Sequence, residues 1–185
     1  MADITWTVLG YTPGRFNKSE VFELPFMSGT ATQTTTALQE FQAKYLGDEL
    51  KDVHPLLIHA PAAYKFHTKD KPVGKMADLA GLKIRAPSRT MTDGLNALGA
   101  TAVGMPVPEV PQALTTGVID GAVIPWEVFG SLRIESVTRD HTEFGMENGG
   151  LSTSVMALVM NRAKYDALPD DLKLIVKTVA MSAAE

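Results

Sequence analysis

Short apolar runs and amphipathic stretches alternate along this chain, which is the pattern of an α/β protein. Continuous or alternating apolar runs predict strands at residues 4–9, 53–60, 64–68, 82–86, 102–105, 118–124 and 151–160. Apolar positions spaced three and four apart predict helices at residues 30–45, 89–98, 108–117, 125–132, 161–166 and 168–179. Because strands alternate with helices through most of the length, we expect an α/β fold with largely parallel sheets.

The stretch from Gly81 to Gly121 is the most informative part, because it reads as strand, helix, strand, helix and strand in close succession. Ser88 is a good N-cap for the first of these helices. Gly99 fits the left-handed residue that ends it. A single arginine, Arg85, stands where the first strand meets that helix, which makes it the first candidate for binding.

Arg85 lies at the carboxyl end of a predicted strand, where open α/β sheets bind ligands. The helix that Ser88 starts offers free N–H groups to an anion, and an arginine binds a carboxylate through two parallel hydrogen bonds. However, Lys83 and Arg85 share one face of the strand, so a solvated strand edge is the alternative. Lys65, on its own, fits a surface lysine.

Composition excludes several classes of function. The 185 residues carry a net charge of −4 with scattered basic residues, which argues against a nucleic-acid-binding face. The absence of cysteine excludes disulfides, thiolate metal sites and a cysteine nucleophile. No run of apolar residues is long enough for a transmembrane helix. No signal peptide precedes Asp3, and the last helical pattern has no cap, so we expect a piece of a longer protein.

Enzyme motifs are absent: there is no G-x-S-x-G, no phosphate-binding G-x-x-x-x-G-K-[ST], no H-E-x-x-H and no G-x-G-x-x-G. Of the histidines, only His59 and His67 could share a site, and nothing marks them as metal ligands. We therefore expect no catalytic residue, no metal and no cofactor. An enzyme acting on a carboxylic acid is the rival interpretation, with Ser88, Asp93 and His67 as its weak candidates.

Several longer motifs stand out: M-A-D-L-x-G-L-K-I-R-x-P at 76–87, L-G-A at 98–100, M-P at 105–106 and E-V-x-x-A-L-x-x-G-V-I-D-G at 109–121. These motifs resemble the substrate-binding subunits of TRAP (tripartite ATP-independent periplasmic) transporters, the DctP family. The segments A-D-I at 2–4, L-P-F at 24–26 and L-P at 168–169 also fit. The similarity covers nearly the whole chain, and the motifs are specific when taken together.

The resemblance implies a monomeric, non-catalytic periplasmic protein with two α/β domains that close around an organic acid in a hinged cleft. It implies delivery of that acid to the membrane permease subunits, and a chain truncated at both ends. We expect a partial first domain at 1–60, a second domain at 61–125, and a hinge-crossing strand with returning helices at 126–185. A ligand-sensing domain of a signalling receptor and a non-functional fragment are the alternatives.

The resemblance also assigns candidate ligand contacts. The signature arginine falls on Arg85, and a second basic position twenty residues earlier falls on Lys65. Family positions that are often polar are Val8 and Ile124 here, so the expected pocket loses polarity. The full set of expected contacts is Arg85, Lys65, Trp6, Val8, Tyr64, Ser88, Val107, Ile124 and Trp126. Trp6, Trp126 and Phe129 also fit core residues, although the abrupt turn at Pro125 favours Trp126 facing a cleft. An aromatic or otherwise largely apolar monocarboxylate is the predicted ligand.

Overall fold

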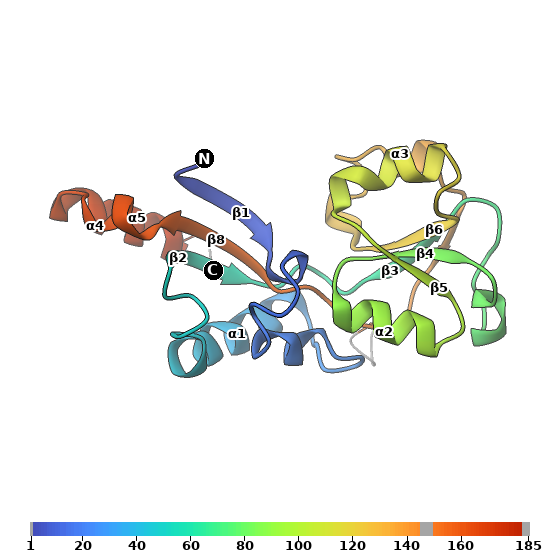
Figure 1. The fold of residues 1–185 in the computed structure, drawn as a ribbon, viewed down its shortest axis with the longest axis horizontal. Coiled ribbons are helices and arrows are strands. Elements are labelled where there is room, and N and C mark those ends of the chain that lie inside the picture. The colour runs from blue at the N-terminus through green and yellow to red at the C-terminus, as the bar shows by residue number, and fades with distance from the viewer. Residues whose placement is uncertain (1, 145–149, 183–185) are drawn as a thin grey trace.

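The structure is a computed structural model of the chain, and it describes residues 2–144 and 150–182. Its strands form two sheets, each in its own lobe, and the lobes lie side by side along the long axis (Figure 1). The first lobe contains β1 (Ile4–Val8), β2 (Val53–His59), β8 (Met156–Asn161), α1 (Ala31–Tyr45), α4 (Arg162–Asp166) and α5 (Asp170–Ser182). The second lobe contains β3 (Lys65–Thr68), β4 (Lys83–Ala86), β5 (Thr101–Gly104), β6 (Gly121–Ile124), β7 (Asp140–Thr142), α2 (Arg89–Ala97) and α3 (Val110–Thr115).

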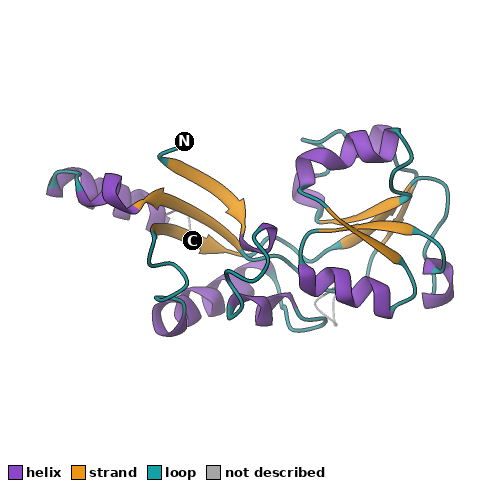
Figure 2. Cartoon of the chain, in the orientation of Figure 1, coloured by secondary structure: helices purple, strands orange, loops and turns teal. Residues whose placement is uncertain are grey.

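Short 3-10 helices fill several connections, and Figure 2 shows helices packed against the sheet of each lobe. Two of them, η1 (Leu9–Tyr11) and η2 (Ser19–Glu23), follow β1. The others are η3 (Met76–Leu79), η4 (Val107–Glu109), η5 (Trp126–Val128) and η6 (Ile134–Ser136). The predicted strand at 118–124 and helix at 125–132 are thus shorter than expected, at β6 and η5.

The prediction of largely parallel sheets is wrong. In the first lobe the strand order is β1–β8–β2, and β8 is antiparallel to both neighbours. In the second lobe the order is β5–β4–β6–β3–β7, where β4 is parallel to β5 and β6 but β3 is antiparallel to β6 and β7. The helix-connected strands do run in common directions. The exceptions, β3, β7 and β8, belong to the segments that enter or leave a lobe.

The helix starts follow from local sequence. Thr30 caps α1 with a reciprocal pair of bonds: its hydroxyl accepts from the Gln33 backbone N–H at 3.2 Å, and the Gln33 side chain accepts from the Thr30 N–H at 3.0 Å. The Ser88 hydroxyl caps α2 by accepting from the Met91 N–H at 3.3 Å. Gly99 ends that helix at a φ of 93°. The predicted caps of α2 are therefore confirmed.

Both lobes have their own apolar core. The core of the first lobe gathers Leu9, Leu38, Leu46, Ile58 and Val155 between α1 and the sheet. The sheet of the second lobe is covered on both faces, and each face has a cluster. The α2 cluster includes Phe66, Ile84, Met91, Leu95 and Val123. The α3 cluster includes Val110, Leu114, Ala122, Ile124 and Ile134.

Two chain segments connect the lobes, and they run next to each other. The first joins β2 to β3 and the second leads into β8; the Tyr64 N–H donates to the Ser152 carbonyl at 2.8 Å between them. The hydroxyls of Tyr64 and Ser154 are also hydrogen-bonded. The two connecting segments are therefore hydrogen-bonded neighbours. The domain boundaries near residues 60 and 125 stay a prediction.

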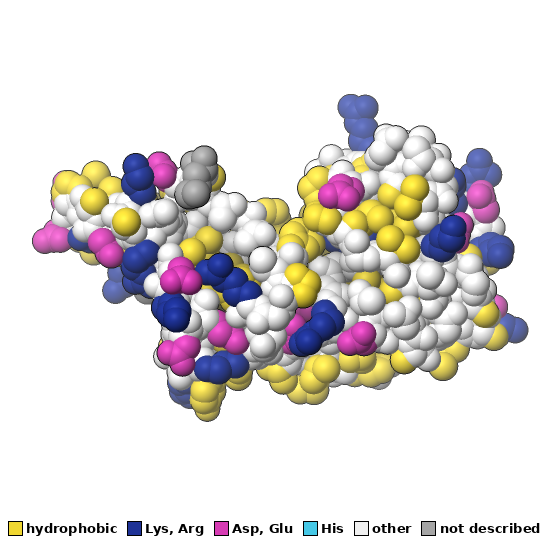
Figure 3. Space-filling model, in the orientation of Figure 1, with side chains coloured by type: hydrophobic (Ala, Val, Ile, Leu, Met, Phe, Trp, Pro, Cys, Tyr) yellow, Lys and Arg dark blue, Asp and Glu magenta, His cyan; other side chains and the backbone are white. Residues whose placement is uncertain are grey.

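The last helix exposes much of its apolar face, at Leu172, Leu174, Ile175 and Val179 (Figure 3). Across residues 2–144 and 150–182, no helix combines the length and apolar character that crossing a membrane requires.

Candidate ligand-binding site

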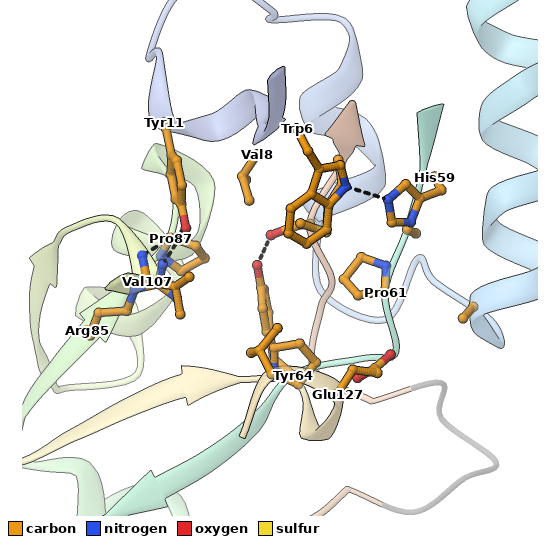
Figure 4. A pocket seen from close by; sticks show the side chains of 16 residues that line it. Trp6, Val8, Tyr11, His59, Pro61, Tyr64, Arg85, Pro87, Val107 and Glu127 are labelled. Carbon is orange, nitrogen blue, oxygen red and sulfur yellow. Dashed lines mark hydrogen bonds between the residues drawn. The ribbon is translucent and has the colours of Figure 1, made fainter. Parts of the chain in front are cut away.

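A cavity of about 240 Å³ lies between the lobes and is lined by both of them. Figure 3 shows the notch that separates the lobes, and Figure 4 shows the lining side chains. Pockets for drug-sized ligands usually measure roughly 300–1,000 Å³, so this one suits a smaller molecule. The lining residues are Trp6, Val8, Tyr11, Ala31, His59, Ala60, Pro61, Tyr64, Arg85, Pro87, Val107, Pro125, Glu127, Val128, Ser154 and Met156.

The first lobe supplies an uncharged wall, which is built on three uncharged residues from neighbouring strands. Val8 of β1 and His59 of β2 both pair with Met156 of β8, so the three form a row across the sheet. Trp6 Nε1–H donates to His59 Nε2 at 3.0 Å, which makes that nitrogen an acceptor. Burial lowers the pKa of His59, so its imidazole is neutral at pH 7. The wall therefore carries indole, imidazole, thioether and alkyl groups.

Arg85 brings a buried positive charge to the opposite wall. It belongs to β4, which is flanked by β5 and β6, and only 2% of the residue is exposed. Its Nε–H donates to the Met105 carbonyl at 2.9 Å and Nη1–H donates to the Val123 carbonyl at 3.1 Å. These acceptors are uncharged, and within residues 2–144 and 150–182 no carboxylate pairs with Arg85. The alternative of a solvated strand edge is therefore wrong for Arg85.

Tyr11 of η1 reaches across from the first lobe to the same place (Figure 4). Its hydroxyl oxygen accepts from Arg85 Nη2–H at 3.2 Å and from the Val107 backbone N–H at 2.9 Å. A hydroxyl has two lone pairs and one hydrogen, so both lone pairs are occupied. The hydroxyl hydrogen takes no part in these two bonds. Arg85 and Tyr11 thus form a cluster of donors at one end.

Glu127 of η5 brings a negative charge to the lining, in addition to the positive charge of Arg85. Its Oε1 accepts a hydrogen bond from the Ala62 backbone N–H at 2.6 Å, which ties η5 to the segment between β2 and β3. In Figure 4 Glu127 and Arg85 lie on opposite sides of the cavity, with Tyr64 between them. The cavity therefore has a cationic end and an anionic end, separated by mostly apolar surface.

Further contacts join the lobes outside the cavity. Arg89 Nη2 lies 2.6 Å from Glu20 Oε2, and the buried Ser88 hydroxyl is hydrogen-bonded to the carboxyl of Glu23. Burial raises the pKa of Glu23, although its bonds to Ser88 and Val155 oppose the shift. A Cβ on Gly10 would lie 2.6 Å from the Ser88 Cβ, so the approach of η1 to α2 requires glycine.

The family model described as "Bacterial extracellular solute-binding protein, family 7" (DctP) matches residues 1–185. The chain belongs to this family. Its proteins are periplasmic solute-binding components of transport that bind small organic acids and work with TRAP permeases. The predicted family and its α/β fold are thereby confirmed.

Known DctP-family proteins resemble this chain closely in structure. A TRAP solute-binding protein from Rhodoferax ferrireducens T118, in complex with copurified benzoate, is 45% identical, with a TM-score of 0.95 over 99% of this chain and 57% of its own. A marine metagenome TRAP solute-binding protein specific for aromatic acid ligands, in complex with 3-hydroxybenzoate, is 45% identical, with a TM-score of 0.92 over 99% of this chain and 58% of its own.

A more distant relative is the C4-dicarboxylate-binding periplasmic protein DctP of Rhodobacter capsulatus, which is 29% identical over 83% of this chain and 45% of its own. The present chain thus spans between 45% and 58% of the length of these three DctP-family proteins.

The structure brings five of the predicted DctP-type contacts to the cavity: Arg85, Trp6, Val8, Tyr64 and Val107. The other four lie outside its lining. Ser88 caps α2 and contacts Glu23, Lys65 is half-buried in β3, and Ile124 is fully buried in the α3 cluster.

Trp126, the fourth, turns away from the cavity despite the sharp turn at Pro125. Its indole packs against the rings of His67 and His141, with centroids 4.7 Å and 5.3 Å away. Its Nε1–H donates to Glu143. Its neighbours Pro125, Glu127 and Val128 line the cavity instead. The sharp turn at Pro125 thus brings the neighbours of Trp126, and not Trp126 itself, to the cavity lining.

The sequence interpretation missed Tyr11, His59 and Glu127 as lining residues. Tyr11 had a signal, since it sits in a glycine- and proline-rich loop directly after a strand, where binding residues gather. His59 and His67 do not share a site: His59 bonds Trp6, whereas His67 bonds His141 Nδ1 at 3.0 Å and the Ile124 carbonyl at 3.0 Å. No group of three potential metal ligands occurs among the residues that the structure describes.

Proposed function

We propose that this chain captures a small aromatic or otherwise largely apolar monocarboxylate and delivers it to the membrane permease of a TRAP transporter. In this proposal the protein acts in the periplasm, catalyses no reaction and needs no cofactor. The observation that carries it is the buried guanidinium of Arg85, unpaired with any described carboxylate, in the wall of a mostly apolar cavity.

The guanidinium calls for an anionic partner. A buried cation has lost its hydration, and uncharged hydrogen-bond acceptors replace only part of it when no counter-charge is present. Of the five N–H donors of an arginine, three are used by Met105, Val123 and Tyr11, which leaves two. A ligand carboxylate would neutralise the charge and accept these two, together with the Tyr11 hydroxyl. Because the three existing bonds hold the guanidinium in place, little further ordering is needed on binding.

The remaining surface favours an apolar body on that carboxylate. Trp6, Val8, Val107 and Met156 offer rings and alkyl groups to the ligand. A sugar acid would place several hydroxyls against this wall, and each buried hydroxyl without a partner costs about 1–3 kcal/mol. Two relatives of 45% identity bind benzoate and 3-hydroxybenzoate, which pair one carboxylate with a flat apolar ring. Their ligands support the same class here.

The proposed transport cycle needs the lobes to open and close. The segments around Tyr64 and Ser152 serve as the hinge; the first lies near the domain boundary predicted at residue 60, and the second lies downstream of the boundary predicted at residue 125. The bonds from Tyr11 to Arg85 and Val107, and the pair of Glu20 with Arg89, then hold the lobes together over the ligand. A carboxylate bound at Arg85 and Tyr11 would favour this closed arrangement because it contacts both lobes.

The test is calorimetric titration of the purified protein with benzoate, 3-hydroxybenzoate, benzamide and glucuronate. We expect benzoate and 3-hydroxybenzoate to bind, and benzamide to bind at least about a hundredfold more weakly, because it has the same ring without the charge. A thermal melt checks folding, since a ligand at a hundred times its Kd adds about 2.7 kcal/mol to the stability.

Two results would overturn the proposal. Tighter binding of glucuronate than of benzoate would contradict the apolar ligand class. Binding of no acid by a protein that melts cooperatively would contradict capture of a carboxylate, and a protein without a cooperative melt would fit the non-functional fragment.

A further inference from the structure

Glu127 gives the cavity a second charged end, and we propose that it selects ligands by the charge they carry opposite their carboxylate. Acids whose far end is neutral or cationic enter, and dicarboxylates are rejected. The proposal rests on the proposed function, because it takes the Arg85 end as the anchor for the first carboxylate. It makes Glu127 a specificity-determining residue for mono- against dicarboxylates.

The fold places the two charges at a fixed separation across the cavity. Arg85 belongs to β4, and Glu127 follows β6, the parallel neighbour of β4, by three residues. Both side chains line the cavity, and Figure 4 shows them on opposite sides of it. A ligand held by its carboxylate at Arg85 therefore extends its body toward Glu127.

The Glu127 carboxylate is held in place although the residue is exposed. Its Oε1 accepts the Ala62 N–H at 2.6 Å, and η5 starts directly after Pro125, whose φ of −77° is restricted by its ring. Moving the carboxylate away would break the bond to Ala62. Within residues 2–144 and 150–182 no lysine, arginine or histidine forms an ion pair with it, so its charge is available to a ligand.

The charges of the lining residues disfavour a second carboxylate on the ligand. Apart from Arg85 and Glu127, the lining groups are uncharged at pH 7, and burial lowers the pKa of His59 so that it is neutral as well. A second ligand carboxylate would face Glu127, and among the described lining residues Arg85, at the other end, is the one cation, since Lys65 is outside the lining. Like charges repel strongly next to low-dielectric surface. A hydroxyl or ammonium group at that end would instead donate to the carboxylate.

The experiment uses three benzoates of nearly one shape that differ in charge at the far end. They are 4-(aminomethyl)benzoate, which is cationic there, 4-(hydroxymethyl)benzoate, which is neutral, and terephthalate, which is anionic; the meta series is measured alongside. Calorimetry on the wild-type protein should rank them in that order, with at least about a tenfold step in Kd between the cationic and the anionic ligand.

The deciding variant is Glu127→Gln, which keeps one oxygen to accept the Ala62 N–H and removes the charge, with an NH2 group in place of the other oxygen. Its ratio of affinities for 4-(aminomethyl)benzoate and terephthalate should fall about tenfold or more. Glu135→Gln, an equal change of charge at an exposed position outside this lining, is the matched control and should keep the wild-type ratio. The Glu127 effect should also shrink at high salt.

The outcomes separate this inference from the proposed function. If the wild-type protein binds benzoate, and Glu127→Gln keeps the wild-type ratio of affinities for 4-(aminomethyl)benzoate and terephthalate, the role of Glu127 is overturned. Carboxylate capture then still stands. An equal fall of the ratio in Glu135→Gln overturns it too, because the effect would then come from overall charge. If the folded wild-type protein binds none of the benzoates, the proposed function fails and this inference fails with it.

Discussion

The two lobes contribute opposite kinds of surface to the cavity between them. The second lobe supplies both charged side chains: Arg85 from β4, and Glu127 from η5, which follows the neighbouring parallel strand β6. The first lobe supplies neutral ones, with Trp6, Val8 and His59 on one wall. This difference suggests that the charge which anchors a ligand and the surface which recognises its body are carried by separate parts of the fold.

The difference has a structural cause. An inner strand has a neighbouring strand on each side, and the Arg85 side chain donates to a carbonyl from each side: Met105 follows β5 and Val123 lies in β6. In the first lobe the wall includes β1, an edge strand of its sheet, where Trp6 is 54% exposed. Changes at the anchored charge should therefore cost more binding than changes on the neutral wall.

The largest effect should come from Arg85→Ala, which removes the charge and the donors at once. We expect the affinity for benzoate to fall about a hundredfold or more, because a charge-assisted pair in an apolar site is lost. Arg85→Lys keeps the charge but cannot reproduce the planar set of donors, so its affinity for benzoate should lie between those of the wild type and Arg85→Ala. Calorimetry measures both. Wild-type affinity in Arg85→Ala would break the comparison outright.

Acid should weaken the second lobe through His67, which is fully buried there. Its Nε2–H must donate to the Ile124 carbonyl, because a carbonyl only accepts, so its Nδ1 accepts from His141. Burial lowers the pKa of His67 from 6.5 to about 4. The unfolded chain therefore binds the proton more readily than the folded one, and stability is lost as pH falls from 6.5 toward 4, by roughly 3 kcal/mol.

Denaturant unfolding of wild type and His67→Gln across that pH range measures this loss. The glutamine amide has both a donor and an acceptor, and its curve should be flatter. Glu23 works in the other direction, since its raised pKa makes stability fall as pH rises above its ordinary value. The difference between the two curves isolates His67. His54→Gln in the first lobe is the control, and an equal flattening there would contradict the assignment.

Tyr11→Phe tests the one donor that the first lobe contributes to the charged end. The variant keeps the ring and loses the hydroxyl that accepts from Arg85 and Val107. We expect benzoate to bind about tenfold more weakly, as for the loss of one hydrogen bond to a charged group. Benzamide, whose carbonyl can accept the same hydroxyl but carries no charge, measures the share of the loss that does not depend on the ligand's charge. An equal loss for both ligands would show that the Tyr11 hydroxyl makes no charge-assisted bond to the carboxylate.

How far the sequence predicted this structure depended on whether the cause was local. The helix caps at Ser88 and Gly99 and the placement of Arg85 at the end of a strand follow from neighbouring residues, and the structure bears them out. The position of β8 between β1 and β2 does not, because it pairs residues from opposite ends of the chain. Tyr11 and Glu127 were missed for the same reason, since the meeting of the lobes brings them to the cavity.

The smallest effect should come from Val8→Thr, a change of nearly equal shape on the neutral wall. Val8 is 7% exposed and lines the cavity, so a hydroxyl there would meet the apolar body of the ligand without a partner. We expect benzoate to bind about fivefold more weakly, against a hundredfold for the charge at Arg85. Thr7→Val, the reverse change on the other face of β1, should leave the affinity unchanged. A loss in Val8→Thr as large as in Arg85→Ala would mean that the neutral wall, not the anchored charge, dominates binding, and the two lobes would exchange the roles assigned to them here.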